Sequence, residues 1–464
     1  MENKHLKLLS VLCFLLFTTL ANAQQKYELT VEEAIELAFK NVMQLKNAQA
    51  DYRIQEAKNK EIFGQALPQV TGDATAQHYL KVPQFLFPNA TDNRIYTILK
   101  EEGVSGSGGP ITKVPEVTYA QVSFQQPWNL TLGATVTQLL FQPDVFVGLQ
   151  ARETALNFSA AQIEQVKVDI KDSAYKRYYA IIIAEKQLHF LNEGVKRLEK
   201  LYNDDSIMYK NGFAEKLDLD KVQVQLTNLK TQQNWTATAI RMAYASLKFV
   251  LGVSQKDTLV LKNDLTLANV KEGILDESFK YEDRPEIQTL NYAKRLQELD
   301  LKRYRLRYFP TVTLLGNYGV TGMGPKFYTD PSTIWLKSSY VGLNVNLPIF
   351  DGTQRRYRIQ QSQLNVEKAE NTINSVKQAI DFEQVFTKES MKNALVNLDL
   401  QEHNMQLAER VYNATKIKFE QGVGSSFEVL QADTDYQTAQ SNFFTALYNA
   451  TLARISYLKS LGKL

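Results

Sequence analysis

Residues that could perform catalysis are few and scattered in this sequence of 464 residues. His78, His189 and His403 lie far apart, and the only cysteine is Cys13. No metal-ligand spacing, nucleophile elbow or phosphate-binding glycine loop occurs. The many Asp and Glu residues fall at helical surface spacing, which is typical of solvated side chains. The sequence therefore predicts no catalytic residue, no metal site and no cofactor. The function of the protein should instead depend on the arrangement of its helices and strands.

The N-terminal segment has the pattern of an export signal. Lys4 and Lys7 precede an apolar run, and Ala21-Asn22-Ala23 fits a cleavage site, so residues 1–23 are predicted to be a signal peptide. The run is too short for a membrane anchor, which needs about 20 apolar residues. The formal net charge of +3 gives no indication of nucleic-acid binding. The mature chain is expected to be exported and free of cysteine.

The sequence contains a duplicated unit. A motif at Gly212 recurs at Gly422, and Gly252 recurs at Gly462, with the same offset of 210 residues. Offsets that hold over long stretches and slip between them indicate a repeat with loop insertions. The predicted domains are therefore a first repeat at 24–252, a linker at 253–283 and a second repeat at 284–464.

Proline positions separate predicted helices from predicted strands. All 12 prolines fall within residues 68–143 or 285–348, and proline breaks helices. Apolar residues with heptad spacing fill the proline-free tracts. Each repeat should therefore contain a first helix, at roughly 31–65 in the first repeat, a long helix and a return helix joined to the long one by a glycine turn. The long helices are predicted over 144–210 and 352–420, and the return helices over 215–251 and 427–461.

Each repeat should also contain a β-hairpin in its proline-containing region, at about 69–140 and 311–348, with loops between the paired strands at about 80–116 and 321–338. Apolar residues alternate with small polar ones there, as in membrane strands with one lipid face and one water face. A soluble hairpin packed on the helices is the alternative. Four strands cannot close a membrane sheet, and open edges are not tolerated in lipid. If the strands span a membrane, several copies of the chain must pool them.

Several motifs in this order resemble the TolC family of outer-membrane efflux channels. They are an opening helix at residues 29–38, an Arg-Pro-Glu-Ile start of the second repeat at 284–287 and a glycine tip motif at 419–430. Prolines also lie where that family has its helix–strand corners. The corner prolines are Pro68, Pro143, Pro310 and Pro348.

This resemblance implies a mainly α fold with membrane β-strands. Three copies would form a 12-stranded β-barrel in the outer membrane of a Gram-negative bacterium and an α-helical tunnel in the periplasm. The function would be that of an exit channel in a tripartite efflux or secretion system, with a periplasmic adaptor and an inner-membrane pump as partners and the linker as an equatorial collar. A periplasmic adaptor protein and a structural coiled-coil protein of the envelope are the alternatives.

The resemblance also assigns candidate gate residues. Glu428 matches the first of two acidic rings at the closed end, whereas Gln431 replaces the second acid, so a single ring and weaker cation preference are expected. Asp218 matches the acid of an inter-helix lock whose basic partner is absent, so closure is expected to rest on Phe427 and its apolar neighbours. The tip turns are the expected adaptor contacts. They comprise Gly212, Phe213, Ala214, Gly422, Val423 and Gly424.

Overall fold

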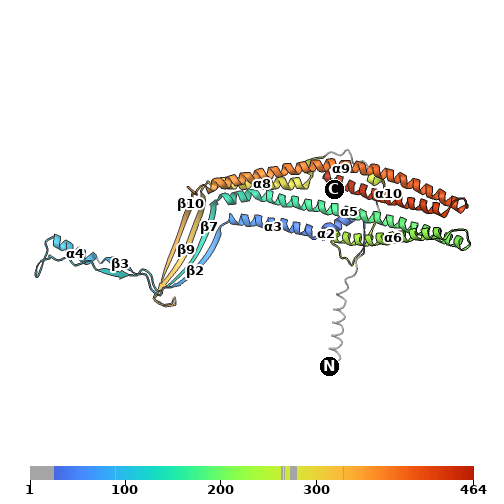
Figure 1. The fold of residues 1–464 in the computed structure, drawn as a ribbon. Helices are drawn as coiled ribbons and strands as arrows, with labels where there is room; N and C mark the ends of the chain where they lie inside the picture. The colour runs from blue at the N-terminus through green and yellow to red at the C-terminus, as the bar shows by residue number, and fades with distance from the viewer. Residues whose placement is uncertain (1–25, 89, 263–264, 266, 272–278, 328) are drawn as a thin grey trace, which may run out of the picture. The chain divides into compact units, whose positions relative to one another are not determined.

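The computed structural model describes residues 26–88, 90–262, 265, 267–271, 279–327 and 329–464. The predicted signal peptide at 1–23 lies outside these residues, as does part of the predicted linker. The chain divides into two units (Figure 1). The helical unit comprises Met1–Ala57, Glu153–Glu298 and Gln363–Leu464, and the strand unit comprises Lys58–Arg152 and Leu299–Ser362.

Four long helices dominate the helical unit. They are α5 (Pro143–Lys210), α6 (Lys216–Leu251), α9 (Gln354–Glu420) and α10 (Ser426–Ser460). Heptad residues of α5, such as Leu198, meet Leu226 of α6 and Leu430 of α10 in one buried cluster. The heptad pattern therefore marks the faces by which the helices pack. Among the described helices, none is both long enough and apolar enough to cross a membrane.

The first helix is not continuous, although the sequence predicted one helix from Val31 to Gln65. It is divided into α2 (Val31–Asn41) and α3 (Met43–Gln65). Val42 has an extended conformation, with ψ of 123°, which suits its β-branched side chain. The turn at Gly252 lies so close to Asn41 that an added Cβ would stand 3.0 Å from its backbone. The break in the helix at Val42 therefore lies beside the turn at Gly252, which packs closely against it.

The described part of the segment between the repeats includes a strand that pairs with the N-terminal strand. β1 (Lys26–Leu29) pairs in parallel with β8 (Thr258–Leu261). The buried Tyr178 hydroxyl of α5 lies 2.9 Å from the Leu29 carbonyl oxygen and 2.6 Å from that of Lys262. The remaining described elements of this segment are α7 (Leu267–Lys271) and η2 (Tyr281–Asp283). Tyr178 thus fastens both strands to the helical unit.

The Arg-Pro-Glu-Ile motif opens α8 (Pro285–Leu306). Pro285 occupies the first helical position, where its missing N–H is no loss. Arg284 donates to the Ser460 carbonyl oxygen at 2.8 Å and to Glu383 Oε2 at 2.9 Å. The motif therefore joins the start of the second repeat to α9 and to the end of α10.

The strand unit contains a four-stranded antiparallel sheet in the order β10-β9-β7-β2. Its strands are β2 (Gln69–His78), β7 (Trp128–Phe141), β9 (Thr311–Gly324) and β10 (Ile334–Asn346). The sheet is open, with β2 and β10 at its edges and nearly all residues of these two strands exposed. The strands of the second repeat extend into residues 321–338, for which the sequence predicted a loop.

The corner prolines lie at the ends of these elements. Pro68 and Pro310 directly precede β2 and β9, Pro143 is the first residue of α5, and Pro348 follows β10. Between β2 and β7 an insertion at residues 79–127 has structure of its own. It contains β3 (Phe85–Pro88), α4 (Ala90–Glu101), β4 (Ser105–Gly106), β5 (Gly109–Pro110) and β6 (Tyr119–Val122). The sequence predicted only a loop there, because its prolines and glycines hide such short elements.

Candidate functional site

The two tip turns have the same backbone structure. Gly212 and Gly422 both have φ of 77°, a left-handed conformation that glycine adopts at little cost. The Phe213 N–H donates to the Met208 carbonyl oxygen at 2.8 Å, and the Val423 N–H donates to that of Lys418 at 3.0 Å. Each long helix therefore ends in a Schellman motif. The sequence repeat at these glycines reproduces one turn twice.

The residues after these glycines differ in exposure. Phe213 is 79% exposed and Val423 is 75% exposed, whereas Ala214 and Gly424 are half-buried. A Cβ at Gly424 would stand 3.3 Å from the Phe419 nitrogen and 3.4 Å from Glu428 Oε2. Glycine therefore lets the turn fold tightly onto the end of α9. A long basic side chain would have to displace these neighbours.

Glu428 lies in the first turn of α10, where its N–H donates to the Ser425 hydroxyl at 3.3 Å. Its carboxylate is exposed and lies 3.8 Å from the Lys418 ammonium. An exposed ion pair of this length holds a side chain weakly. The Glu428 carboxylate is therefore free to interact with ions or with other copies of the chain.

Gln431 contacts an acidic residue, Asp435, that was not singled out from the sequence. Its side-chain amide donates to Asp435 Oδ1 at 3.0 Å. Glu428, Gln431 and Asp435 follow one another at helical spacing, and all three are exposed. Asp435 adds a second carboxylate to the face of α10 that carries Glu428, one turn beyond the position of the missing acid. The spacing of four residues from Gln431 was the signal that could have revealed it.

Asp218 and Phe427 are connected through a lysine. The Lys221 ammonium lies 3.2 Å from Asp218 Oδ1 and 4.8 Å from the centre of the Phe427 ring. Asp218 and Lys221 belong to α6, and Phe427 belongs to α10. The candidate lock residue Asp218 thus has a basic partner on its own helix. The cation–π contact connects the helical hairpin of the first repeat, α5 and α6, with that of the second repeat, α9 and α10.

Asp205 is a buried carboxyl group below the tips that was not singled out from the sequence. Its side chain has no exposed surface, and among the described residues neither carboxyl oxygen meets a partner in hydrogen-bonding geometry. Burial raises the pKa of Asp205, the nearby Ser426 hydroxyl lowers it in part, and the Asp218 and Asp204 charges raise it again. Burial of Asp205 therefore favours the neutral form of this group.

A largely buried ion pair joins the two helical hairpins farther along the helices from the tip turns. Arg197 Nε of α5 lies 2.7 Å from Asp433 Oδ1 of α10, and Asp433 is 1% exposed. Gln437 donates to the other carboxylate oxygen. The guanidinium lies 5.3 Å and 5.2 Å from the ring centres of Tyr412 and Tyr436. Burial raises the pKa of Asp433 although Arg197 opposes this shift.

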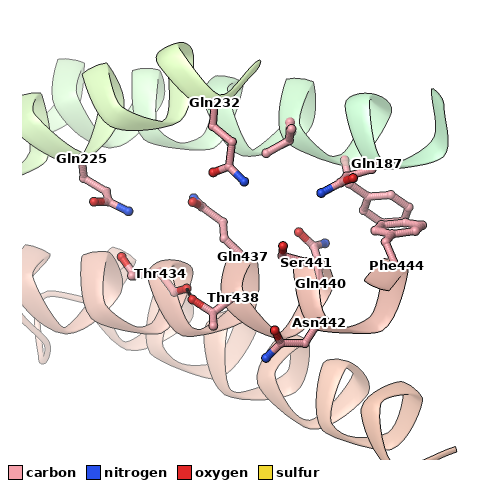
Figure 2. Close-up of a pocket in the computed structure, with 12 residues that line it drawn as sticks. Gln187, Gln225, Gln232, Thr434, Gln437, Thr438, Gln440, Ser441, Asn442 and Phe444 are labelled. Atoms are coloured by element: carbon pink, nitrogen blue, oxygen red, sulfur yellow. Dashed lines mark hydrogen bonds between the residues drawn. The ribbon is translucent and has the colours of Figure 1, made fainter. Parts of the chain in front are cut away.

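An uncharged polar cavity of about 230 Å³ lies beside this pair. Figure 2 shows side chains of α6 and α10 facing each other across it, among them Gln225 and Gln232 opposite Gln437. Phe444 and the buried Gln440 also line it. The two return helices thus face each other through amide groups at this level, and the Arg197–Asp433 pair links α5 to α10 beside the cavity.

The histidines form no centre among the described residues. His78 stacks on Trp128 at 4.1 Å between ring centres, and His189 contacts Phe190. Within the same described residues, no group of three or more His, Cys, Asp and Glu side chains could hold a metal ion.

Known proteins resemble this chain over most of its length. Residues 282–463 match the family model described as "Outer membrane efflux protein". The chain is 24% identical to the probable efflux pump outer membrane protein TtgC of Pseudomonas putida, covering 72% of this chain and 69% of the relative. It is 17% identical to the outer membrane protein TolC of Vibrio cholerae, covering 72% and 77%. The solved outer-membrane channel OprN shares its fold, with a TM-score of 0.71 at 14% identity, covering 94% of this chain and 90% of OprN.

Proposed function

We propose that this chain, a member of the TolC family of outer membrane efflux proteins, is the outer-membrane exit channel of an efflux system. The match of the second repeat to the family model carries this conclusion. It lies in the outer membrane of a Gram-negative bacterium, as its relatives TtgC and TolC do by name. TtgC is by name a protein of an efflux pump, so the function proposed for this chain is transport.

The exposed edges of the helical unit support assembly as a homotrimer. Figure 1 draws α5 and α10 between α6 and α9. α6 exposes five large apolar side chains that are spaced seven or eleven residues apart. Residues at these spacings point in nearly the same direction, so the five side chains share one face of the helix. They are Leu217, Val224, Trp235, Met242 and Phe249. α9 exposes a second set, namely Phe386, Val396, Leu400, Leu407 and Val411.

Two different apolar edges on one unit favour a head-to-tail interface. Such an interface generates a ring when its rotation closes. The edge strands β2 and β10 impose the same requirement, since an unpaired strand edge is not tolerated in lipid. Three copies would supply twelve strands to one closed sheet, which accounts for four strands in each chain. Lipid would contact the outer face of that sheet, and the helices would form a tunnel in the periplasm.

Glu428 and Asp435 are the residues proposed to set ion preference at the periplasmic end. Both are exposed on one face of α10, with Gln431 between them. Three copies would present two rings of carboxylates, and rings of like charge in a narrow pore attract cations. Cation preference should therefore match that of a channel with two acidic rings.

Closure of the tip is proposed to rest on two links between the hairpins. One is the cation–π contact of Phe427 with Lys221, which pairs with Asp218, and the other is the buried Arg197–Asp433 pair. A buried pair costs several kcal/mol when one partner is removed, roughly 3–5 kcal/mol. The exposed Phe213 and Val423 at the tips are the proposed docking points for a periplasmic adaptor, which would connect the channel to an inner-membrane pump.

Fractionation of cells that produce the full-length chain tests this function. We expect the protein in the outer-membrane fraction, running on gels as a trimer that dissociates on heating. A soluble monomer in the periplasmic fraction would instead fit an adaptor or a structural coiled-coil protein, and it would overturn the proposal.

A further inference from the structure

The 79–127 insertion carries an aromatic face that stays exposed among the described residues of the chain. β3 and β6 pair antiparallel, with Phe85 opposite Val122 and Phe87 opposite Ala120. Alternate residues of a strand point to the same side, so Phe85 and Phe87 share a face. Phe124 joins them, with its ring centre 5.9 Å and 5.6 Å from theirs. We call these three residues the aromatic face.

These rings remain open to solvent. Phe85 is 53% exposed, Phe87 44% and Phe124 64%. β3 and β6 form a sheet of two short strands, and an isolated two-stranded hairpin is at best marginally stable in water. Exposed apolar patches on a folded protein usually mark an interaction surface. The aromatic face therefore requires a partner surface to bury it.

The position and charge of the insertion favour a second copy as that partner. The insertion follows the edge strand β2, which in the proposed trimer pairs with β10 of the neighbouring copy, so it lies at the seam between copies. It contains four basic and four acidic residues. A neutral segment has no electrostatic attraction to an anionic lipid surface and no charge repulsion from its own copies.

We propose that the aromatic faces of the three insertions pack against one another and form a cap that narrows the outer mouth of the channel. This rests on the proposed function, since it needs the trimer. The contact buries aromatic rings that a single chain leaves exposed, and it is continuous with the strand interface between copies. The cap limits entry of solutes from outside, at the end opposite the periplasmic gate.

Cross-linking in the full-length trimer tests the contact directly. Phe87→Cys places a thiol on the aromatic face, and Leu86→Cys places one on the opposite face of the same strand, where the native side chain is more exposed. With a short bis-maleimide, we expect several-fold more covalent dimer from Phe87→Cys than from Leu86→Cys. Equal yields from the two variants would overturn the cap, and they would also be the outcome if lipid or another protein covers the face.

A second measurement reports on the channel itself. The double variant Phe85→Ser/Phe124→Ser should still form trimers, and its single-channel conductance in planar bilayers should exceed that of Leu86→Ser and of the unchanged protein. An unchanged conductance of intact trimers would contradict the cap while leaving the proposed function standing. Absence of trimers in the unchanged protein would instead refute the proposed function.

Discussion

At the residue scale, ion preference depends on carboxylates that no ion pair holds firmly. Glu428 is 3.8 Å from Lys418, and both side chains are exposed. Replacing Glu428 by Gln should lower the cation-to-anion permeability ratio several-fold, because one ring of charges disappears. Single-channel reversal potentials in a salt gradient measure this ratio. Glu389→Gln removes an exposed acid of α9 and is the control. Equal permeability ratios in the two variants would show that Glu428 does not line the pore.

Asp205 makes stability depend on pH. Its pKa in the folded chain is raised, chiefly by burial, so between the unfolded and folded pKa values the folded state binds more protons. Stability therefore falls as pH rises through that window and stays reduced above it. Asp205→Asn should raise the free energy of unfolding by about 1–3 kcal/mol at pH 8 and have little effect near pH 4.

Thermal melting of trimers in detergent at several pH values measures this effect. The control is Asp51→Asn, the same substitution at an exposed position of α3. A profile for Asp205→Asn that runs parallel to that of the unchanged protein would show that Asp205 titrates normally.

At the element scale, the tips depend on two left-handed glycines. Gly422→Ala should destabilise the second hairpin by about 1–2 kcal/mol, since an L side chain is strained at positive φ. Gly64→Ala in α3 is the matched control, because its added Cβ meets nothing within 4 Å and alanine favours helix by about 0.5–1 kcal/mol. Denaturant unfolding of the two variants should give changes of opposite sign. A stable Gly422→Ala variant would mean that the turn can adopt another conformation.

Helices of this chain could be predicted well because their signals are local. The proline-free tracts and glycine caps locate α5, α6, α9 and α10 to within a few residues. The break at Val42 could not be predicted, because it depends on the approach of Gly252 from a distant turn. The elements of the 79–127 insertion escaped notice because none of its strands exceeds four residues.

The candidate site was predictable only where a motif marks it. The glycine turns and Glu428 follow from the repeat and the family pattern. Arg197 and Asp433 are 236 residues apart in the sequence, and only the packing of α5 on α10 brings them together. Asp205 likewise resembles any solvated helix carboxylate in the sequence. Burial, which decides its chemistry, is a property of the folded chain.

At the scale of the whole molecule, assembly should depend on the apolar edges of the helical unit. Trp235 of α6 is 70% exposed in the single chain, and burying such a ring between copies stabilises an interface by roughly 2–3 kcal/mol. Trp235→Ser should lower the trimer fraction in detergent, as size-exclusion chromatography with light scattering measures. Ile207→Ser, at an exposed position of α5 outside the proposed interfaces, should leave it unchanged. A trimer fraction unaffected by Trp235→Ser would place the interface elsewhere.

Single-channel recording from the purified full-length protein in planar bilayers tests the exit-channel function most directly. The proposed function predicts discrete, cation-preferring conductance steps from the trimer fraction, larger when Asp433→Ala or Phe427→Ala weakens the links between hairpins. Membranes that stay silent with verified trimers, in the unchanged protein and in both variants, would contradict the assignment of this chain as an exit channel.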